Sequence, residues 1–357
     1  MGVKRVLVVD DSLTIRKLIV ELINKQFDFT VVGEAQDGQE AIELTERLKP
    51  DVITMDMMMP KFNGYEATRL IMANCPTPIL IISASTNRGE LMKTYDVLAA
   101  GAVSVVEKPG ASATIDDTWE HELLVELRLV SRIPVVRHLE GQWDKDLWAR
   151  KTNGVGQPLA TVASKAFTHV VIGGSTGAPG ALNTLLKALP EDFALPIVCV
   201  IHINDAFSTS LAQWLDRSSK LNVVTPQNHE TYNRPGCVFV APCGVHLVMD
   251  KFRLRYSDGP LRNYCRPSVD ELFESAAKAQ GSGLIGVLLT GMGKDGAQGI
   301  KAIKEAGGYT ITQSEESCVV YGMPAQADKL CDNDKHLSPQ AIAEHLVALA
   351  DKSYQFS

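Results

Sequence analysis

Several features that would mark a nucleic-acid-binding, disulfide-rich or membrane protein are missing from this sequence of 357 residues. The formal net charge is −7 and no long basic run occurs, so the chain offers no electrostatic footprint for nucleic acid. Its seven cysteines include no C-x-x-C pair, which argues against a disulfide framework and against a zinc site. No apolar run approaches the roughly 18 residues that a membrane-spanning helix requires.

The first residues also show no targeting segment. The chain enters an apolar strand at Arg5–Val9 without a signal peptide, and Val6 stands where an N-myristoylation pattern needs serine or threonine. We therefore expect a soluble, cytoplasmic protein with no membrane insertion and no nucleic-acid partner. The length and a hydrophobic content of 45% are sufficient for about two domain cores.

Residues 1–125 alternate short Val/Ile/Leu runs with amphipathic segments. Such alternation predicts a parallel sheet covered by helices on both faces, with five strands at 6–9, 30–33, 52–55, 79–82 and 104–106. Polar residues come at the ends of four of these strands, at the sheet edge where doubly wound folds bind ligands: Asp10, Asp11, Asp56, Ser83 and Lys108. Three carboxylates at one edge repel one another unless a cation lies among them, and oxygen ligands of this kind suit Mg²⁺.

With Pro60, Gly64 and a Lys108–Pro109 turn for which we expect a cis peptide, this pattern resembles the receiver domain of bacterial two-component response regulators. The resemblance implies a flavodoxin-like fold and a histidine kinase as the phosphoryl donor. It further implies a role for each polar residue: Asp56 as phospho-acceptor, Asp10 and Asp11 with Asp56 as Mg²⁺ ligands, Ser83 as switch hydroxyl and Lys108 as phosphate contact. Val105 departs from the pattern, since receivers usually carry an aromatic residue there.

Regular patterns fade between residues 126 and 166, which we interpret as an interdomain linker. Pro134, Gly141 and Pro158 break regular elements within it. Trp143 and Trp148 are unusual in a free tether, and we expect them to pack against one of the domains.

The segment 168–177 runs an apolar strand into the glycine turn Gly173–Gly177, which displays Ser175. Pro179 is placed for the first turn of a following helix. A serine on such a strand–turn–helix bend has the setting of a nucleophile, with backbone N–H groups near it that can stabilise an oxyanion. The turn alone is equally compatible with a structural or phosphate-binding loop.

Two further strand ends of the second domain, residues 167–357, supply partners for this serine. His202 follows the apolar run 195–201, and Asp295 lies in a glycine loop after the run 284–289. If the three loops share one sheet edge, His202 can take the proton of Ser175 while Asp295 orients the imidazole ring. The chain order Ser, His, Asp differs from that of α/β-hydrolases, chymotrypsin and subtilisin.

Each of these residues also has a structural interpretation. A histidine that closes an apolar strand is commonly a satisfied core residue, and His169 and His246 compete for the role of base. An aspartate in a glycine-rich loop is commonly a helix cap. Ser268 with Glu271 reads as a capping box, which explains both residues without a catalytic role. A nucleotide-binding site is not indicated, because the glycine turn lacks both G-x-G-x-x-G spacing and a Walker lysine.

The second domain resembles the catalytic domain of chemotaxis receptor methylesterases, a family in which it follows a receiver domain. The motifs that carry the resemblance are the runs 172–177, 240–242 with 246–247, 265–270, 289–296 and 321–324. It implies a doubly wound, mostly parallel α/β fold, a catalytic triad of Ser175, His202 and Asp295, and an oxyanion-hole N–H from Met292. The implied substrate is the γ-methyl ester of glutamate on methyl-accepting chemotaxis receptors, with glutamine deamidation as a second activity and no cofactor for ester hydrolysis.

The sequence departs from this family beside the base, where Ile201 and Ile203 flank His202 in place of the usual Gln and Met, and Ala178 replaces a glycine. The leading hypothesis is a hydrolase activated by phosphorylation at Asp56, in which the receiver covers Ser175 until phosphorylation shifts the domain arrangement. The alternative is a receptor-docking response regulator whose esterase domain is inactive because of the altered loop.

Overall fold

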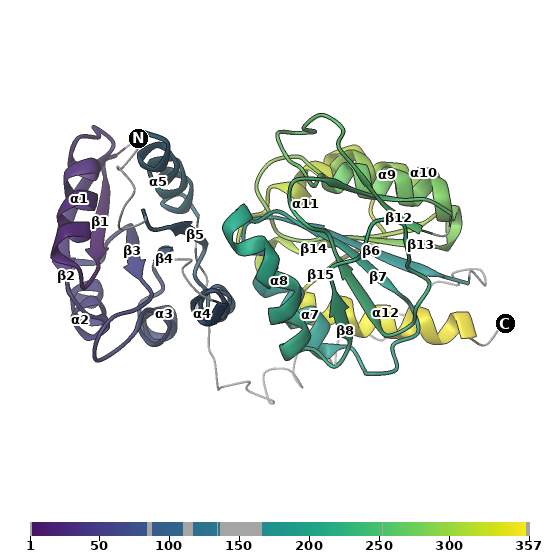
Figure 1. Cartoon of the computed structure of the whole chain (residues 1–357), viewed down its shortest axis with the longest axis horizontal. Helices are drawn as coiled ribbons and strands as arrows, with labels where there is room; N and C mark the ends of the chain where they lie inside the picture. Colours follow the sequence, from purple (N-terminus) through teal and green to yellow (C-terminus); the bar gives the residue numbers. More distant parts are fainter. Residues whose placement is uncertain are drawn as a thin grey trace.

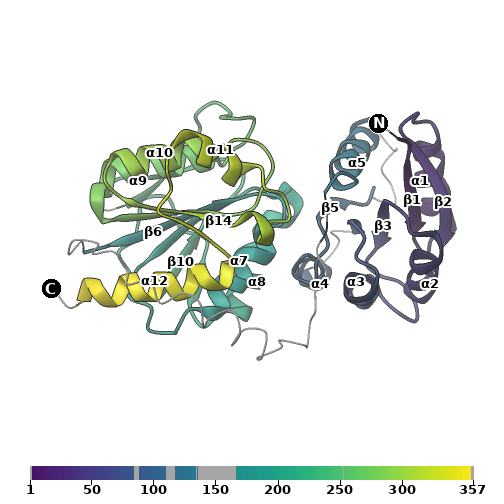
Figure 2. The same ribbon diagram turned by 180° about the vertical axis from the view of Figure 1, so that it is seen from behind.

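The structure is a computed structural model that describes residues 2–83, 88–109, 117–133, 135, 166–251 and 253–354. Two α/β units lie next to each other in Figures 1 and 2, the N-terminal one in purple and blue and the C-terminal one in teal, green and yellow. Each unit contains a parallel sheet with helices against its faces. The predicted α/β class with two domains is confirmed.

The N-terminal unit is a five-stranded parallel sheet in the order β2-β1-β3-β4-β5. Its strands are β1 (Lys4–Val9), β2 (Phe29–Ala35), β3 (Val52–Asp56), β4 (Ile79–Ser83) and β5 (Ser104–Glu107). Its helices are α1 (Leu13–Asn24), α2 (Gly38–Leu48), α3 (Gly64–Asn74), α4 (Arg88–Ala99) and α5 (Asp117–Val130). Every residue of β3 and β4 is buried, which explains why both read as continuous apolar runs rather than as alternating ones.

Three details of the first domain bear on the sequence predictions. The boundary predicted at residue 125 falls inside α5, which continues to Val130. The expected cis peptide at Lys108–Pro109 is wrong: the cis peptide of the described residues joins Arg266 to Pro267. Most of the predicted linker, including Trp143 and Trp148, lies outside the described residues.

The C-terminal unit contains a seven-stranded parallel sheet in the order β15-β14-β13-β6-β7-β10-β8. Its strands are β6 (His169–Gly174), β7 (Ile197–Ile201), β8 (Asn222–Val224), β10 (Cys237–Val240), β13 (Leu284–Leu288), β14 (Tyr309–Gln313) and β15 (Lys335–Leu337). The neighbours β13, β6 and β7 form the centre of the sheet, and all of their residues are buried. The predicted mostly parallel, doubly wound domain is confirmed.

Helices cover both faces of this sheet (Figures 1 and 2). One face carries α7 (Ala178–Ala188), α8 (Asp205–Ser218) and α12 (Pro339–Tyr354), and the other carries α9 (Val269–Gln280), α10 (Ala297–Glu305) and α11 (Met323–Leu330). A small antiparallel sheet of β9 (Glu230–Thr231), β11 (His246–Met249) and β12 (Arg253–Ser257), which the sequence analysis did not identify, packs beside α9. The two faces of the large sheet are thereby closed over separate apolar clusters.

The two units meet where α4 of the first packs against α7 and α8 of the second. The Tyr95 ring stacks on Trp214 with centroids 5.1 Å apart, and the Tyr95 hydroxyl donates to the Phe207 carbonyl oxygen. The Trp214 indole N–H donates to Asp96 Oδ1 at 2.8 Å. Because Tyr95, Phe207 and Trp214 belong to one continuous buried cluster, this part of the interface has the character of a protein core.

Among the described residues, no helix is both long and apolar enough to cross a membrane.

Candidate active site and phospho-acceptor site

The three residues predicted to form a relay follow three adjacent strands of the large sheet. Ser175 comes directly after β6, His202 directly after β7, and Asp295 lies in the loop between β13 and α10. Since the strand order is β13-β6-β7 and all are parallel, the three loops share one carboxyl edge, with the serine loop in the middle. This placement is the one that doubly wound sheets use for ligand binding.

Glycines shape the turn that carries Ser175. Gly177 has φ +79, a left-handed conformation that favours glycine, and it begins α7 with Pro179 in the first turn. A Cβ on Gly173 would lie 2.1 Å from a methyl group of Val269, so the missing side chain lets the start of α9 approach β6. The Ser175 N–H donates to the Thr290 carbonyl oxygen at 3.0 Å, which ties the turn to the loop after β13.

His202 and Asp295 form a buried, charge-assisted pair. His202 Nε2 lies 2.9 Å from Asp295 Oδ2, and the side chains are 15% and 3% exposed. Burial lowers the pKa of His202, but the hydrogen bonds and charges of Asp295 and Cys265 together outweigh burial and raise this pKa to about 9. Burial likewise opposes ionisation of Asp295, yet the bond from His202 helps to hold its pKa at about 2. The pairing thus favours the imidazolium form of His202 and the carboxylate form of Asp295.

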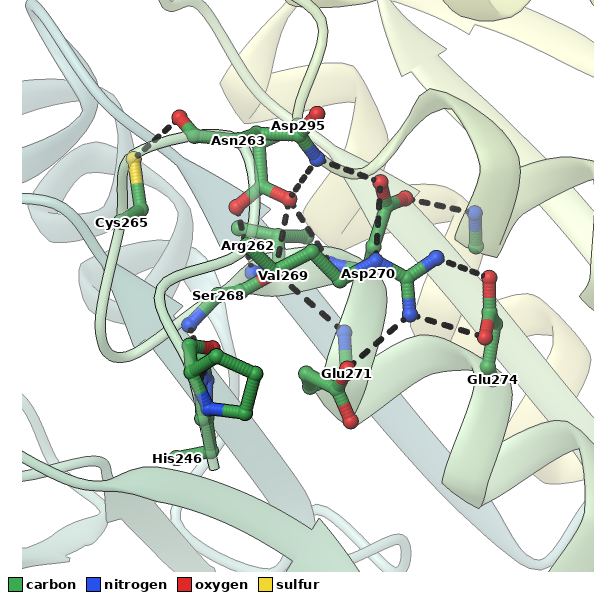
Figure 3. Close-up of polar contacts among 12 residues, drawn as sticks. His246, Arg262, Asn263, Cys265, Ser268, Val269, Asp270, Glu271, Glu274 and Asp295 are labelled. Carbon is green, nitrogen blue, oxygen red and sulfur yellow. Dashed lines mark hydrogen bonds and ion pairs between the residues drawn. The ribbon is translucent and has the colours of Figure 1, made fainter. Parts of the chain in front are cut away.

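Further donors surround the Asp295 carboxylate, as Figure 3 shows. Oδ1 accepts from Ser268 Oγ at 2.8 Å and from Asn263 Nδ2 at 2.9 Å, while Oδ2 accepts from the Val269 N–H at 2.7 Å. Ser268 is the N-cap of α9, where its Oγ also accepts from the Glu271 N–H. The carboxylate thus lies at the positive end of a helix, a location that favours the ionised form.

A second carboxylate, that of Asp270, is linked to Asp295 through Asn263. Asn263 Nδ2 donates to Asp270 Oδ2 at 2.9 Å as well as to Asp295, and Asp270 Oδ1 accepts from the Gly299 N–H at 2.7 Å. Burial raises the pKa of Asp270 to about 6, with the charge of Asp295 adding to the effect. Arg262 closes the network by pairing with Glu274 and Glu271 of α9 (Figure 3).

The competing histidines are engaged elsewhere. His246 accepts from the Ser268 N–H at Nδ1 and lies 3.0 Å from the Pro260 carbonyl oxygen at Nε2. His169 is at the start of β6, the opposite edge of the sheet, where burial lowers its pKa to about 4. Of the three candidate bases, only His202 lines a cavity together with Ser175.

The His202 imidazole does not face Ser175 directly in this arrangement. Its second nitrogen, Nδ1, lies 3.7 Å from Cys265 Sγ, and no hydrogen bond between Ser175 and His202 occurs within the described part of the chain. A relay that transfers the serine proton needs such a bond. In the described arrangement the ring contacts Cys265 and Asp295 instead.

The loop after β13 also brings backbone donors toward Ser175. A Cβ on Gly291 would lie 2.8 Å from Ser175 Cβ, so the serine packs directly on this glycine. Met292 follows, its side chain 54% exposed, and its N–H makes no hydrogen bond to the described residues. A free N–H one residue from the serine contact is suited to an oxyanion hole.

Ser175 and His202 face a cavity of about 320 Å³ between the two domains. The catalytic domain contributes the serine turn and the loop after β7. The first domain contributes six residues to the same cavity, from α4, from β5 and the residue before it, and from α5: Leu98, Val103, Ser104, Val105, Glu122 and Glu126. The first domain therefore borders the cavity of the candidate nucleophile, which is the placement that the occlusion hypothesis of the sequence analysis requires.

The acidic cluster of the first domain is assembled as predicted. Oxygen atoms of Asp10, Asp11 and Asp56 lie within 4.8 Å of one another. Lys108 Nζ lies 2.9 Å from both Asp10 Oδ2 and Asp56 Oδ1. Asp10 Oδ2 is buried and, apart from this ammonium, has no hydrogen-bond partner among the described residues.

These features fit a divalent cation. Burial raises the pKa of Asp56 to about 6 against the opposing effect of Lys108. Added positive charge would relieve this cost, and carboxylate oxygens are the ligands that Mg²⁺ prefers. The Ser83 hydroxyl, at the end of β4, lies 3.2 Å from Thr94 Oγ1 on α4, the helix that carries Tyr95.

Sequence reasoning missed three residues of the site. Asn263 has no local signal, because its contacts with Asp270 and Asp295 depend on the loop before α9 folding back on the sheet edge. Ser268 was identified as a cap, and the structure gives its hydroxyl a second role as donor to Asp295. Cys265 was placed in a motif but not beside His202.

Comparison with known proteins gives two family matches. The family model described as CheB methylesterase matches residues 170–346, and the response regulator receiver domain model matches residues 6–119. A protein-glutamate methylesterase/protein-glutamine glutaminase of Syntrophus aciditrophicus is 37% identical over 97% of this chain and 98% of its own. A protein of the same description from Anaeromyxobacter dehalogenans is 40% identical over 95% and 96%.

Among solved structures, the Thermotoga maritima CheB methylesterase catalytic domain is 36% identical, covers 52% of this chain and 100% of its own, and has a TM-score of 0.49. The full-length relatives match both domains in one alignment. The chain belongs to the CheB methylesterase family, in the form that carries a response regulator receiver domain ahead of the catalytic domain.

Proposed function

We propose that this protein is a phosphorylation-activated hydrolase that demethylates glutamate γ-methyl esters on methyl-accepting chemotaxis receptors and deamidates receptor glutamines. The observation that carries the proposal is the grouping of Ser175, His202 and Asp295 on three adjacent strand ends, with the His202–Asp295 bond already formed at 2.9 Å. The full-length relatives named protein-glutamate methylesterase/protein-glutamine glutaminase support it.

In the proposed reaction, Ser175 Oγ attacks the γ-carbonyl carbon of the ester and its proton passes to neutral His202. The oxyanion is stabilised by backbone N–H groups, including that of Met292. The C–O bond to the methoxy group then breaks, and His202 returns the proton so that methanol leaves. Water hydrolyses the acyl-enzyme by the same steps and releases the glutamate carboxyl group. An amide substrate follows the same course with ammonia as the leaving group.

Asp295 keeps the imidazole oriented and stabilises its charged form. Besides His202, Asp295 accepts hydrogen bonds from four backbone and side-chain donors, which favour its ionised form. Asp295 keeps its contact with the imidazole ring at the same time. In the closed protein the contacts with Asp295 and Cys265 raise the pKa of His202, which favours the protonated ring and opposes its action as a base. Entry of substrate and rotation of the ring toward Ser175 would precede proton transfer.

Phosphorylation is proposed at Asp56, with a histidine kinase as donor. Asp10, Asp11 and Asp56 would hold Mg²⁺, which when bound supplies the positive charge that the acidic cluster lacks. Lys108 would contact the phosphoryl group. The Ser83 hydroxyl would move toward the phosphoryl group and shift Thr94 of α4, which it contacts. Since α4 packs on α7 and α8, this movement would loosen the interface over Ser175.

One assay tests the enzymatic proposal against the docking alternative. Methanol release from membranes that contain methylated receptors is measured with the wild type and with Ser175→Ala, each after treatment with acetyl phosphate and Mg²⁺. The serine variant should fold normally and lose several orders of magnitude in rate. A folded Ser175→Ala that releases methanol as fast as the wild type would refute the assignment, and no release from either would favour a docking protein. Asp56→Asn should not incorporate phosphate.

A further inference from the structure

The helix α5 of the receiver extends a glutamate into the cavity that contains Ser175. Glu122 and Glu126 lie one helical turn apart on α5, on the same face, and both line this cavity. Their carboxyl groups have different partners. Glu126 accepts from Ser104 Oγ at 2.8 Å, within the receiver itself. Glu122 crosses the domain boundary.

The partner of Glu122 is Asn204, two residues after the candidate base. Asn204 Nδ2 donates to Glu122 Oε1 at 2.7 Å, and Asn204 lines the same cavity as Ser175 and His202. Asn204 belongs to the loop after β7, in the segment where this sequence departs from its family. The relay described above gives it no role.

The geometry points to Asn204 as a substrate-binding residue whose amide binds the γ-carbonyl oxygen of the substrate glutamyl group, and to Glu122 as a product mimic that occupies this subsite in the closed protein. The proposal rests on the proposed function, whose product is a glutamate side chain on a protein. An amide N–H donates equally to a carboxylate, an ester carbonyl or an amide carbonyl, so one donor serves the methyl ester, the glutamine and the product.

Glu122 as a product mimic would explain how the receiver closes over this particular site and can still be released. A hydrogen bond with one charged partner stabilises more than a neutral one, so Glu122 favours the closed state. Glu122 also lies near the carboxyl groups of Glu107 and Glu126, whose pKa values are raised by burial and then by its charge. The hydrogen bond from the Asn204 amide offsets the repulsion among these carboxylates. A substrate carbonyl must displace Glu122 to reach Asn204, so substrate and Glu122 compete for this amide.

The first test compares two receiver variants in the unphosphorylated full-length protein, with methanol release from methylated receptor membranes as the readout. Glu122→Ala should raise kcat/KM roughly 10-fold, the shift expected from loss of one charged hydrogen bond. Glu120→Ala is the matched control, because it removes the same charge from the same helix on the side that faces Lys25. An unchanged rate in Glu122→Ala, or an equal rise in Glu120→Ala, would overturn the mimic.

The second test separates positioning of substrate from simple contact with the receiver. In the phosphorylated protein, where the receiver is displaced, Asn204→Ala should lower kcat about 10-fold, because the γ-carbonyl oxygen becomes the oxyanion of the tetrahedral intermediate, and Asn204→Gln should recover part of the loss. If Asn204 only holds the receiver, kcat in the phosphorylated form will equal that of the wild type. Either failure leaves methanol release by the wild type intact, whereas failure of the proposed function abolishes Ser175-dependent release in every variant.

Discussion

Replacing Tyr95 with alanine should activate the unphosphorylated protein, because this ring joins α4 of the receiver to α8 of the catalytic domain. The substitution removes the stack on Trp214 and the hydrogen bond to the Phe207 carbonyl oxygen. The two contacts contribute about 1 kcal/mol each, so the ratio of closed to open protein should fall by roughly 30-fold. Tyr95→Phe keeps the stack and loses the hydroxyl, and it should lower this ratio about 5-fold.

The assay is the initial rate of methanol release before and after phosphorylation. Rates without phosphorylation should increase in the order wild type, Tyr95→Phe, Tyr95→Ala, and should not exceed the rate of the phosphorylated wild type, because an equilibrium shift can only fill the open state. Phe29→Ala is the control. Phe29 is a buried residue of the receiver on β2, the sheet edge farthest from β5, so it destabilises the receiver without touching the interface.

Two outcomes would refute the reasoning. The first is a folded Tyr95→Ala protein whose unphosphorylated rate equals that of the wild type, which would mean that the α4 contact does not limit access to Ser175. The second is an equal increase in the phosphorylated and unphosphorylated rates, which would place the effect on the chemical step rather than on the domain equilibrium. Circular dichroism and thermal unfolding establish that the variants are folded.

Three further predictions follow from the site. His202→Ala should lose several orders of magnitude in ester hydrolysis, whereas His246→Ala should keep most of it, because that ring bonds Ser268 and Pro260; the reverse order in steady-state rates would make His246 the base. Because the pKa of His202 is raised from 6.5 to about 9, its pair with Asp295 stabilises the fold below about pH 6.5 and this contribution is lost as the pH rises through about 9. Urea unfolding should show Asp295→Asn to lack this pH dependence, which is worth on the order of 3 kcal/mol, and a parallel pair of stability curves would contradict it. Ser83→Ala should weaken activation by acetyl phosphate more than Val105→Ala, since Ser83 contacts Thr94 beside Tyr95; equal effects in methanol release would exclude this route.

The sheet of each domain could be predicted because parallel strands are buried on both faces and read as short apolar runs. The runs at β3 and β4 were placed within one residue of their observed bounds, and those at β6 and β7 within two. Glycine chemistry then located Ser175, since Gly177 needs a left-handed conformation. The grouping of residues at strand ends was also predictable, because the carboxyl ends of parallel strands meet at one sheet edge for any loop conformation.

Long-range loop contacts and the domain interface were not predictable. Asn263 reaches Asp295 across 32 residues of sequence and Tyr95 reaches Phe207 across 112, and neither contact leaves a local pattern. Ser268 was missed for a different reason. The capping pattern explains the residue fully, so nothing in the sequence indicates that its hydroxyl also donates to Asp295. The helix α5 was assigned partly to the linker, since a helix end without a cap or glycine signal gives no boundary.

The buried cluster that runs from Tyr95 into Leu182 and Trp214 without a break also links how the two domains unfold. Domains that share apolar contacts melt together, whereas domains joined by a tether alone melt separately. We therefore expect the closed protein to unfold as one cooperative unit in a calorimeter, and opening of the interface should divide this into two transitions. Activation should then lower the thermal stability of the protein, because opening the interface exposes apolar surface whose burial stabilises both domains.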